Sequence, residues 1–203
     1  MRKFKLGAKK KSEPREDKKK SKKLIGYFVM AIMILSVAGI VGNYGDAEEV
    51  EIINDIKFIQ ENNLWKVKLD GQYMYFNFLP NQVEDISIDD SSKFLLKQKA
   101  FQFTYSPDEE LVQDIAVAQF NVMRNLQDIR KIQFITGLTK ENSYGLQIIT
   151  CNQTTPNMPV IEFRQANETK LYSENGCIIG EAFTSHDFAR LKDKLLYVVY
   201  DVI

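Results

Sequence analysis

The distribution of hydrophobic and polar residues contains one continuous apolar segment, residues 24–42, with nineteen residues and no charge. A helix of that length spans roughly 28 Å, about the thickness of the hydrocarbon core of a bilayer. The segment therefore predicts a transmembrane helix. A cleaved signal peptide and a pilin-type leader are the alternatives. A signal peptide has a shorter apolar region of about 7–15 residues, and Gly39, Gly42 and Gly45 interrupt the continuous helix of a pilin.

Short alternating runs after this segment predict an N-terminal β-meander. Strands are expected at 56–59, 64–69 and 72–78, and in the last two apolar or aromatic residues alternate with polar ones. An Asp-Gly pair at 70–71 matches a type I′ hairpin turn, in which both central residues have positive φ. Residues 85–92 are rich in Asp and Ser, and they are expected to form a loop.

A strand–helix–strand unit is predicted next. Ser106 fits the N-cap of a helix, Pro107 its first turn and Glu109 a capping box, so the helix is expected to begin there and to end near residue 127. Two strands joined by one helix usually lie parallel in the same sheet. The strands of this unit are expected at 100–105 and 132–136.

Further short strands and a last helix complete the expected domain. Thr184 and Asp187 match a capping box, and the residues that follow form an apolar helix face that continues into an apolar C-terminus, 197–203. The predicted fold class is therefore α+β, with an N-terminal β-meander, a strand–helix–strand unit and a C-terminal amphipathic helix. The remaining strands are expected at 146–151, 160–164, 170–172 and 176–183, and the helix face at Phe188, Leu191, Leu195 and Val198.

Charge divides the chain and predicts its orientation. Residues 1–23 hold 12 Lys and Arg against three acidic residues, whereas residues 43–203 hold 15 Lys and Arg against 24 acidic residues. Basic residues that flank a span stay in the cytoplasm. We therefore expect a disordered basic cytoplasmic tail over 1–23, an acidic linker over 43–55 and an extracytoplasmic domain over 56–203. The expected location is the cell membrane, single-pass, with the N-terminus cytoplasmic and the C-terminal domain outside.

The basic tail has two interpretations. It can fix the topology and attract anionic lipid headgroups, or it can bind nucleic acid. The lipid interpretation is favoured, because the lysine run adjoins the span and contains no aromatic residue for base stacking. The expected partners are the lipid bilayer through residues 24–42, anionic headgroups through the tail and an unidentified envelope protein, with no nucleic acid.

Four segments of the expected outer domain carry a recognisable pattern: WKVKLDGQYMYFNFLP, TCNQTTPNMPVIEF, ETKLYSENGCIIGEAF and DFARLKDKLLY. Through them, most of the domain resembles single-pass membrane proteins of small-genome archaea. The segments share with that family a strand, a cysteine, Pro-Val-Ile, a second cysteine and a terminal amphipathic helix. The resemblance implies an archaeal, anchored, extracytoplasmic domain of this architecture, and it implies no activity.

The chain has two cysteines, Cys151 and Cys177. In a domain outside the reducing compartment such a pair is expected to form a disulfide. Two Asn-X-Thr sequons make Asn152 and Asn167 candidate glycosylation sites on the same side of the membrane.

The sequence favours a domain without a metal ion or cofactor. Its single histidine, His186, lies at the start of the last predicted helix, and there is no C-x-x-C pair and no glycine-rich phosphate motif. Ser185, His186 and Asp187 are the three residue types of a catalytic triad, but consecutive residues at a helix start point in different directions. We therefore expect no catalytic, cofactor-binding or metal-binding residue.

Acidic residues supply the remaining candidates. Asp85, Asp89 and Asp90 form a candidate partner-binding loop, and calcium binding there is an alternative, although their spacing does not match an EF-hand. Without a recognisable catalytic set, a membrane-anchored extracytoplasmic binding or scaffolding protein is favoured over an enzyme. Two alternatives stay open: a surface-tethered hydrolase that uses paired carboxylates, and a pilin-like envelope subunit.

Overall fold

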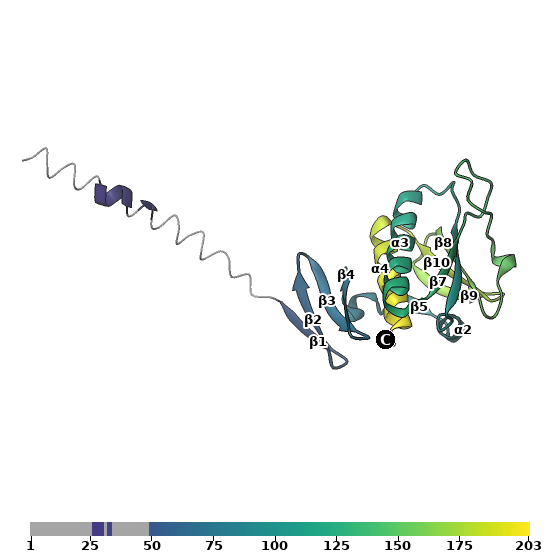
Figure 1. Cartoon of the computed structure of the whole chain (residues 1–203), viewed down its shortest axis with the longest axis horizontal. Coiled ribbons are helices and arrows are strands. Elements are labelled where there is room, and N and C mark those ends of the chain that lie inside the picture. Colours follow the sequence, from purple (N-terminus) through teal and green to yellow (C-terminus); the bar gives the residue numbers. More distant parts are fainter. Residues whose placement is uncertain (1–25, 31, 34–48) are drawn as a thin grey trace, which may run out of the picture. The chain divides into compact units, whose positions relative to one another are not determined.

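The computed structural model describes residues 26–30, 32–33 and 49–203 (Figure 1). Within these residues, no helix is long and apolar enough to cross a membrane. Seven residues of the segment at 24–42 are described, and they are helical. The rest of that segment, the tail at 1–23 and residues 43–48 of the expected linker lie outside the described residues. The transmembrane helix, the topology and the membrane location therefore stay predictions.

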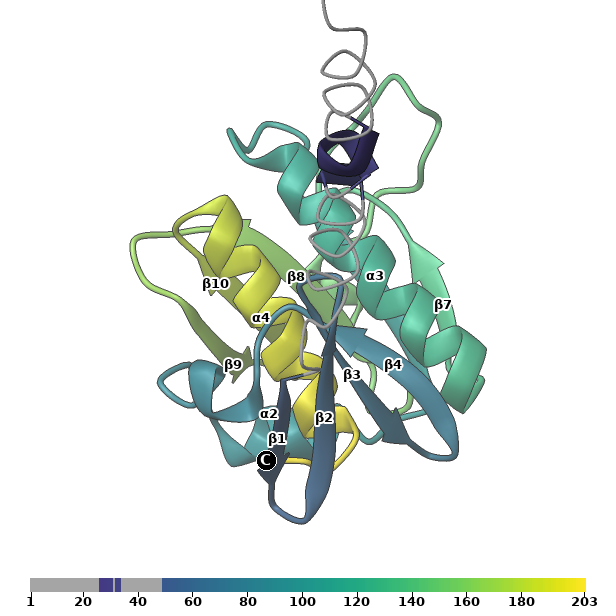
Figure 2. The ribbon, with the colours of Figure 1, turned by 90° about the vertical axis from the view of Figure 1, so that its left-hand side faces the viewer.

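The C-terminal part of the chain begins with a four-stranded antiparallel meander, which Figure 2 shows in front. The turn at 70–71 has positive φ at both residues, 48° at Asp70 and 80° at Gly71, which confirms the expected type I′ hairpin. The strands, paired in chain order, are β1 (Val50–Ile53), β2 (Ile56–Glu61), β3 (Leu64–Leu69) and β4 (Gln72–Phe76).

Strand β1 lies inside the segment expected to be a linker, 43–55. Asn54 and Asp55 have positive φ, 51° and 62°, and they form the turn that pairs β1 with β2. The acidic composition of this segment suggested a linker, but the Asn-Asp turn makes it the first hairpin. The folded domain therefore begins before residue 56.

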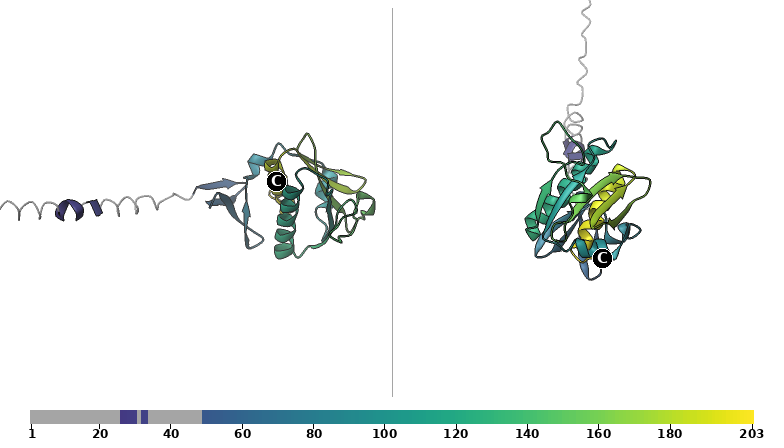
Figure 3. Two further views of the ribbon diagram at one scale, coloured as in Figure 1. Left: turned by 90° about the horizontal axis from the view of Figure 1, so that it is seen from above. Right: turned by 90° about the vertical axis from the view of Figure 1, so that its right-hand side faces the viewer.

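A six-stranded mixed sheet forms the second layer of strands (Figure 3). Strands β6 and β7 are parallel neighbours joined through helix α3 (Val112–Arg130), so the expected parallel strand–helix–strand unit is confirmed. The strand order is β5-β9-β10-β8-β6-β7, and β9 runs antiparallel to β10. The strands are β5 (Ser87–Ile88), β6 (Ala100–Tyr105), β7 (Gln133–Thr136), β8 (Val160–Gln165), β9 (Lys170–Glu174) and β10 (Cys177–Ala182).

Helices α3 and α4 (Ser185–Val199) lie between the two sheets (Figures 1 and 3). Thr184 and Asp187 form the expected capping box of α4. Because α4 packs against both sheets, every side chain from Leu191 to Tyr200 is buried, including those of Lys192 and Asp193. The expectation of an amphipathic helix with one apolar face therefore understates its burial.

The expected start of α3 at Ser106 and Pro107 is wrong. The helix begins at Val112, after Leu111, and no side chain caps it. The Ser106 hydroxyl accepts a hydrogen bond from the Asp108 N–H at 3.3 Å, and the Asp108 carboxylate binds Lys140 Nζ at 2.6 Å. These contacts fold the segment before the helix into turns, so Ser106 is bound locally before the helix starts.

Two further expectations differ from the structure. The strand expected at 146–151 is an irregular segment with one isolated bridge, Leu138 to Ile148, and it ends in the 3₁₀ helix η2 (Cys151–Gln153). The loop expected at 85–92 contains β5 and the start of helix α2 (Asp90–Leu95), because Asp89 accepts the Ser92 N–H at 2.6 Å and caps that helix. A 3₁₀ helix, η1 (Pro80–Val83), precedes it.

Candidate functional site

Strand β4 forms one edge of the meander, and it leaves part of its main chain unpaired. In a two-residue hairpin the residues that flank the turn form a hydrogen-bonded pair, and such pairs alternate with non-bonded ones along the strands. Leu69 pairs with Gln72, and Val67 pairs with Met74. The N–H and C=O groups of Tyr73 and Tyr75 therefore point away from β3. Within residues 49–203, no other group hydrogen bonds to them.

A groove of about 660 Å³ runs along this open edge, and α3 forms its other wall. Its volume lies within the range of ligand-binding cavities. The groove is lined by Gln72, Tyr73, Met74, Tyr75 and Asn77 of the hairpin, by Asn121, Arg124, Asn125, Asp128 and Ile129 of α3, and by Leu64 and Lys192.

Aromatic and polar side chains give the groove its chemical character. Tyr73 is 61% exposed and Tyr75 is 43% exposed, and Lys66 Nζ lies 5.0 Å from the centre of the Tyr73 ring. On α3 the lining residues are two amides, one cation, one carboxylate and the apolar Ile129, spaced so that they share one helix face. The groove therefore combines exposed main-chain groups with aromatic surface and with side chains that donate and accept hydrogen bonds.

The end of β4 is fixed by α4. Asp193 accepts the N–H groups of Asn77 at 2.7 Å and Phe78 at 2.9 Å, and its other oxygen lies 2.7 Å from Lys192 Nζ. The Tyr197 hydroxyl donates to the Phe78 carbonyl at 2.6 Å. Burial raises the pKa of the Asp193 carboxyl and of the Tyr197 hydroxyl. These contacts from α4 hold the end of the edge strand in place, so the groove is preformed.

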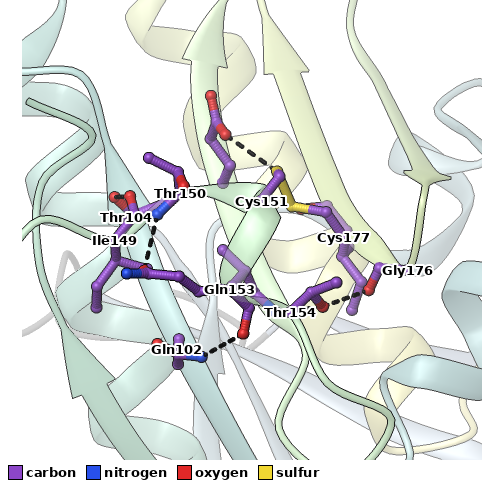
Figure 4. The surroundings of a disulfide bond; sticks show 12 residues. Gln102, Thr104, Ile149, Thr150, Cys151, Gln153, Thr154, Gly176 and Cys177 are labelled. Atoms are coloured by element: carbon purple, nitrogen blue, oxygen red, sulfur yellow. Dashed lines mark hydrogen bonds between the residues drawn. A yellow bond between two sulfur atoms is a disulfide. The ribbon is translucent and has the colours of Figure 1, made fainter.

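The second notable site lies on the face of the six-stranded sheet that is turned away from the helices. The sulfur atoms of Cys151 and Cys177 are 2.04 Å apart, at the distance of a disulfide (Figure 4). Cys151 begins η2 and is partly exposed, whereas Cys177 begins β10 and is fully buried with Ile149, Val160 and Ile179. The cysteine pair expected from the sequence is therefore brought together.

A carboxyl group lies against this disulfide. Glu162 Oε2 is 3.2 Å from Cys151 Sγ, and within the described residues no hydrogen-bond donor or cation pairs with the side chain of Glu162. Burial raises the pKa of Glu162, Arg164 opposes this shift and Glu109 adds to it. Arg164 does not pair with Glu162, because its guanidinium binds Glu181 at 2.8 Å. Glu162 is thus a half-buried carboxyl without a cationic partner.

The three acidic loop residues have separate roles inside the fold. Arg190 forms an ion pair with Asp85 and holds the pKa of that carboxyl below its usual range. Asp89 caps α2 and also accepts the Ser173 N–H at 3.0 Å. Asp90 is exposed beside Lys93, 3.7 Å away. All three carboxylates are exposed, but Asp85 and Asp89 contact other elements of the domain, whereas Asp90, among the described residues, contacts only Lys93 of its own helix.

The candidate glycosylation residues Asn152 and Asn167 are both exposed, in η2 and in the turn between β8 and β9.

One group of potential metal ligands occurs among the described residues. It consists of Cys151, Glu162 and Cys177, whose ligand atoms lie within 4.8 Å of one another. Because the two sulfur atoms are bonded to each other, they are not metal ligands while the disulfide is intact.

The sequence did not identify Glu162 or the open edge of β4. Alternation along β8 places Glu162 on the face opposite to Ile161 and Phe163, which was a usable signal. The signal was incomplete, because only the non-local pairing of β8 with β10 brings Glu162 to the cysteines.

Comparisons with protein-family models, with curated proteins and with solved structures found no match. The resemblance to archaeal membrane proteins therefore stays a prediction.

Proposed function

We propose that the protein is a membrane-anchored, extracytoplasmic binding protein whose outer domain captures an extended segment of another protein. The segment would bind in the groove between β4 and α3 and add a fifth strand to the meander. The observation that carries this proposal is the open edge of β4, where Tyr73 and Tyr75 direct unpaired N–H and C=O groups into the groove. An exposed strand edge is a template for pairing with another chain.

An extended polypeptide fits this site for two reasons. Its main chain supplies donors and acceptors at the two-residue spacing of Tyr73 and Tyr75, and strand addition of this kind is a recurring mode of peptide recognition. The walls then supply specificity, because alternate side chains of the bound strand would meet the exposed tyrosines on one side and Arg124 or Asp128 on the other. Main-chain bonds provide affinity, and side-chain contacts select the partner.

The predicted anchor explains how a groove of this size becomes effective. A partner held in or near the same membrane is met at a high effective concentration, which converts a weak contact into a stable one. The topology behind this argument is testable by adding protease to intact cells or spheroplasts. The C-terminal domain should be removed and an N-terminal tag should be protected. Digestion of the tag instead would contradict the proposed orientation.

The hydrolase alternative has less support. A carboxylate-based hydrolase needs two acidic groups that face each other across a cleft. Asp128 is the one acidic residue among those that line the groove. The acids of the expected partner-binding loop, Asp85, Asp89 and Asp90, do not line the groove, and each forms a contact within the domain. The geometry therefore favours binding.

The test starts from peptides selected from a random library displayed on phage, with the full chain in detergent or nanodiscs as bait. Each selected peptide is resynthesised with single N-methyl groups along its length. Strand addition predicts a loss of affinity at alternate positions, because only every second amide of the bound strand would face β4. On the protein, Tyr75→Pro should abolish binding, because it removes an outward N–H, and edge strands tolerate proline.

Tyr75→Phe is the matched control, because it keeps the ring and the N–H and should bind the same peptides. Circular dichroism and thermal unfolding establish that both variants are folded. Equal binding to Tyr75→Pro and Tyr75→Phe, or N-methyl effects without a two-residue period, would contradict strand addition. A selection that enriches no peptide, while a glycan array gives Tyr75-dependent binding, would show that the occupant is not a polypeptide.

A further inference from the structure

The environment of the Cys151–Cys177 disulfide differs on its two sides. Cys151 is partly exposed on η2, whereas Cys177 is fully buried in an apolar cluster with Ile149 and Val160. A thiolate from solution therefore reaches Cys151 first. Attack on a disulfide sulfur expels the other sulfur as a thiolate, so the leaving group would be Cys177. A thiolate in an apolar cluster is unfavourable unless it receives a proton.

Glu162 is placed to supply that proton. Its Oε2 lies 3.2 Å from Cys151 Sγ, and its nearest oxygen and both sulfur atoms lie within 4.8 Å of one another. Burial raises the pKa of this carboxyl, so its protonated form persists to higher pH than in an exposed glutamic acid. The charged groups that act on it are Arg164 and Glu109, and Arg164 is itself bound to Glu181.

A disulfide that only cross-links the chain would not need this carboxyl. Placing an unpaired acid in a half-buried site costs free energy. In the part of the chain that the structure describes, the one polar contact of the Glu162 carboxyl is Cys151 Sγ, which carries no hydrogen in the disulfide. Groups that are costly for folding and poised beside a reactive bond are typical of functional sites.

We propose that this disulfide is a thiol–disulfide exchange centre that oxidises a dithiol of a partner molecule, with Cys151 as the attacked sulfur and Glu162 as the proton donor. One partner thiolate attacks Cys151 Sγ and forms a mixed disulfide. The sulfur–sulfur bond breaks, its electron pair goes to Cys177 Sγ, and the proton of Glu162 converts Cys177 to a thiol.

The second partner thiolate then attacks the partner sulfur of the mixed disulfide and releases Cys151 as a thiolate. Glu162, reprotonated from water, lies within reach to protonate it. The partner dithiol becomes a disulfide, the Cys151–Cys177 bond becomes two thiols, and two electrons pass to the protein. The two protons lost by the partner enter the solvent, and two return through Glu162. This activity is independent of the groove beside β4.

The test measures reduction of the folded full chain by dithiothreitol, from pH 5 to pH 9, with the rate divided by the thiolate concentration. Wild-type protein should show a rate that falls as Glu162 ionises. Glu162→Gln should be slower by roughly 100-fold at low pH, a typical effect of general acid catalysis, and its normalised rate should not depend on pH. Glu141→Gln changes an exposed carboxyl of the segment before η2, and it should match wild type.

A second measurement identifies the attacked sulfur. Acid-quenched reactions with glutathione, analysed by mass spectrometry, should place the mixed disulfide on Cys151. Three outcomes would overturn the proposal: a mixed disulfide on Cys177, a pH profile shared by Glu162→Gln and wild type, or reduction that occurs only after urea unfolds the chain. The wild-type pH profile alone decides the role of Glu162 if Glu162→Gln fails to fold.

Discussion

The two sheets of the domain are built in different ways. The meander pairs β1 to β4 in chain order, so each contact is local, and its last strand leaves one edge open. The six-stranded sheet pairs β8 with β6 and with β10, across intervening segments of chain. Residues 138–159, here called the cover segment, lie on its outer face, and the Cys151–Cys177 disulfide ties them to β10. An open edge suits binding of a partner strand, whereas a covered and cross-linked face suits chemistry on fixed groups.

Helix α4 connects these two regions. Its Asp193 and Tyr197 hold the end of β4, and its Phe188 and Leu191 belong to the same hydrophobic core as the six-stranded sheet. The Asn54 side chain also donates to the Val202 carbonyl at 3.1 Å, which ties the first hairpin to the C-terminus. Helix α4 therefore holds the meander, with its open edge, against the six-stranded sheet.

The largest expected loss of stability follows from a change in α4, which packs between the two sheets. Asp193→Ala removes the buried acceptor of the Asn77 and Phe78 N–H groups and leaves Lys192 without its buried counter-charge. Breaking a buried ion pair of this kind costs about 3–5 kcal/mol of unfolding free energy. Urea unfolding measures the loss. Glu141→Ala, an exposed control, should stay within about 0.5 kcal/mol, and a similarly small loss for Asp193→Ala would mean that α4 does not join the sheets.

The second largest loss of stability is expected in the six-stranded sheet, when its disulfide is removed. Replacing both Cys151 and Cys177 by Ala opens a loop of 26 residues, which costs about 3–4 kcal/mol in the chain-entropy model. Hydrogen exchange should increase most in the cover segment, residues 138–159, and least in the meander. Equal increases in both regions would show that the disulfide stabilises the domain as a whole rather than the covered sheet.

The third comparison concerns two helix starts that look alike in sequence. Thr184 accepts the Asp187 N–H and caps α4, so Thr184→Ala should cost about 1 kcal/mol. Ser106 lies before the start of α3 and makes a local turn contact, so Ser106→Ala should cost less than about 0.5 kcal/mol. Thermal unfolding of the two variants decides this, and the reverse order would place the start of α3 at Ser106.

The smallest expected effect is a pH dependence at the disulfide. Burial raises the pKa of folded Glu162 above its unfolded value of about 4.3, so ionising this group opposes folding at higher pH. Glu162→Gln should therefore increase the unfolding free energy above the folded pKa, and the gain should vanish as the pH falls below about 4. A gain that is the same at all pH values would show that the charge of Glu162 is not the cause.

Local signals in the sequence predicted local structure well. The Asp-Gly turn located β3 and β4, the strand pattern located β6, and Thr184 with Asp187 located the start of α4. The capping pattern at Ser106 failed because Asp108 binds Lys140, 32 residues away. The strand expected at 146–151 failed because η2 and the disulfide redirect the chain there.

The candidate sites were harder to predict because each combines distant segments. Disulfide pairing followed from the presence of two cysteines in a presumed oxidising compartment, but the position of Glu162 depends on the order of β8 and β10. The groove depends on where α3 lies relative to β4, which no local pattern determines. The sequence therefore predicted most of the elements and one cross-link, missed β1, β5 and α2, and left both sites to be found from the structure.

The most direct test of the open edge is hydrogen exchange of individual amides in β4, followed by NMR with and without a selected peptide. In the free chain the Met74 amide should be protected by its pairing with Val67, whereas the Tyr73 and Tyr75 amides should exchange quickly. The bound peptide should protect Tyr73 and Tyr75 and leave Met74 unchanged. Equal protection of all three amides in the free chain, or fast exchange at Tyr73 and Tyr75 in the complex, would contradict strand addition at β4.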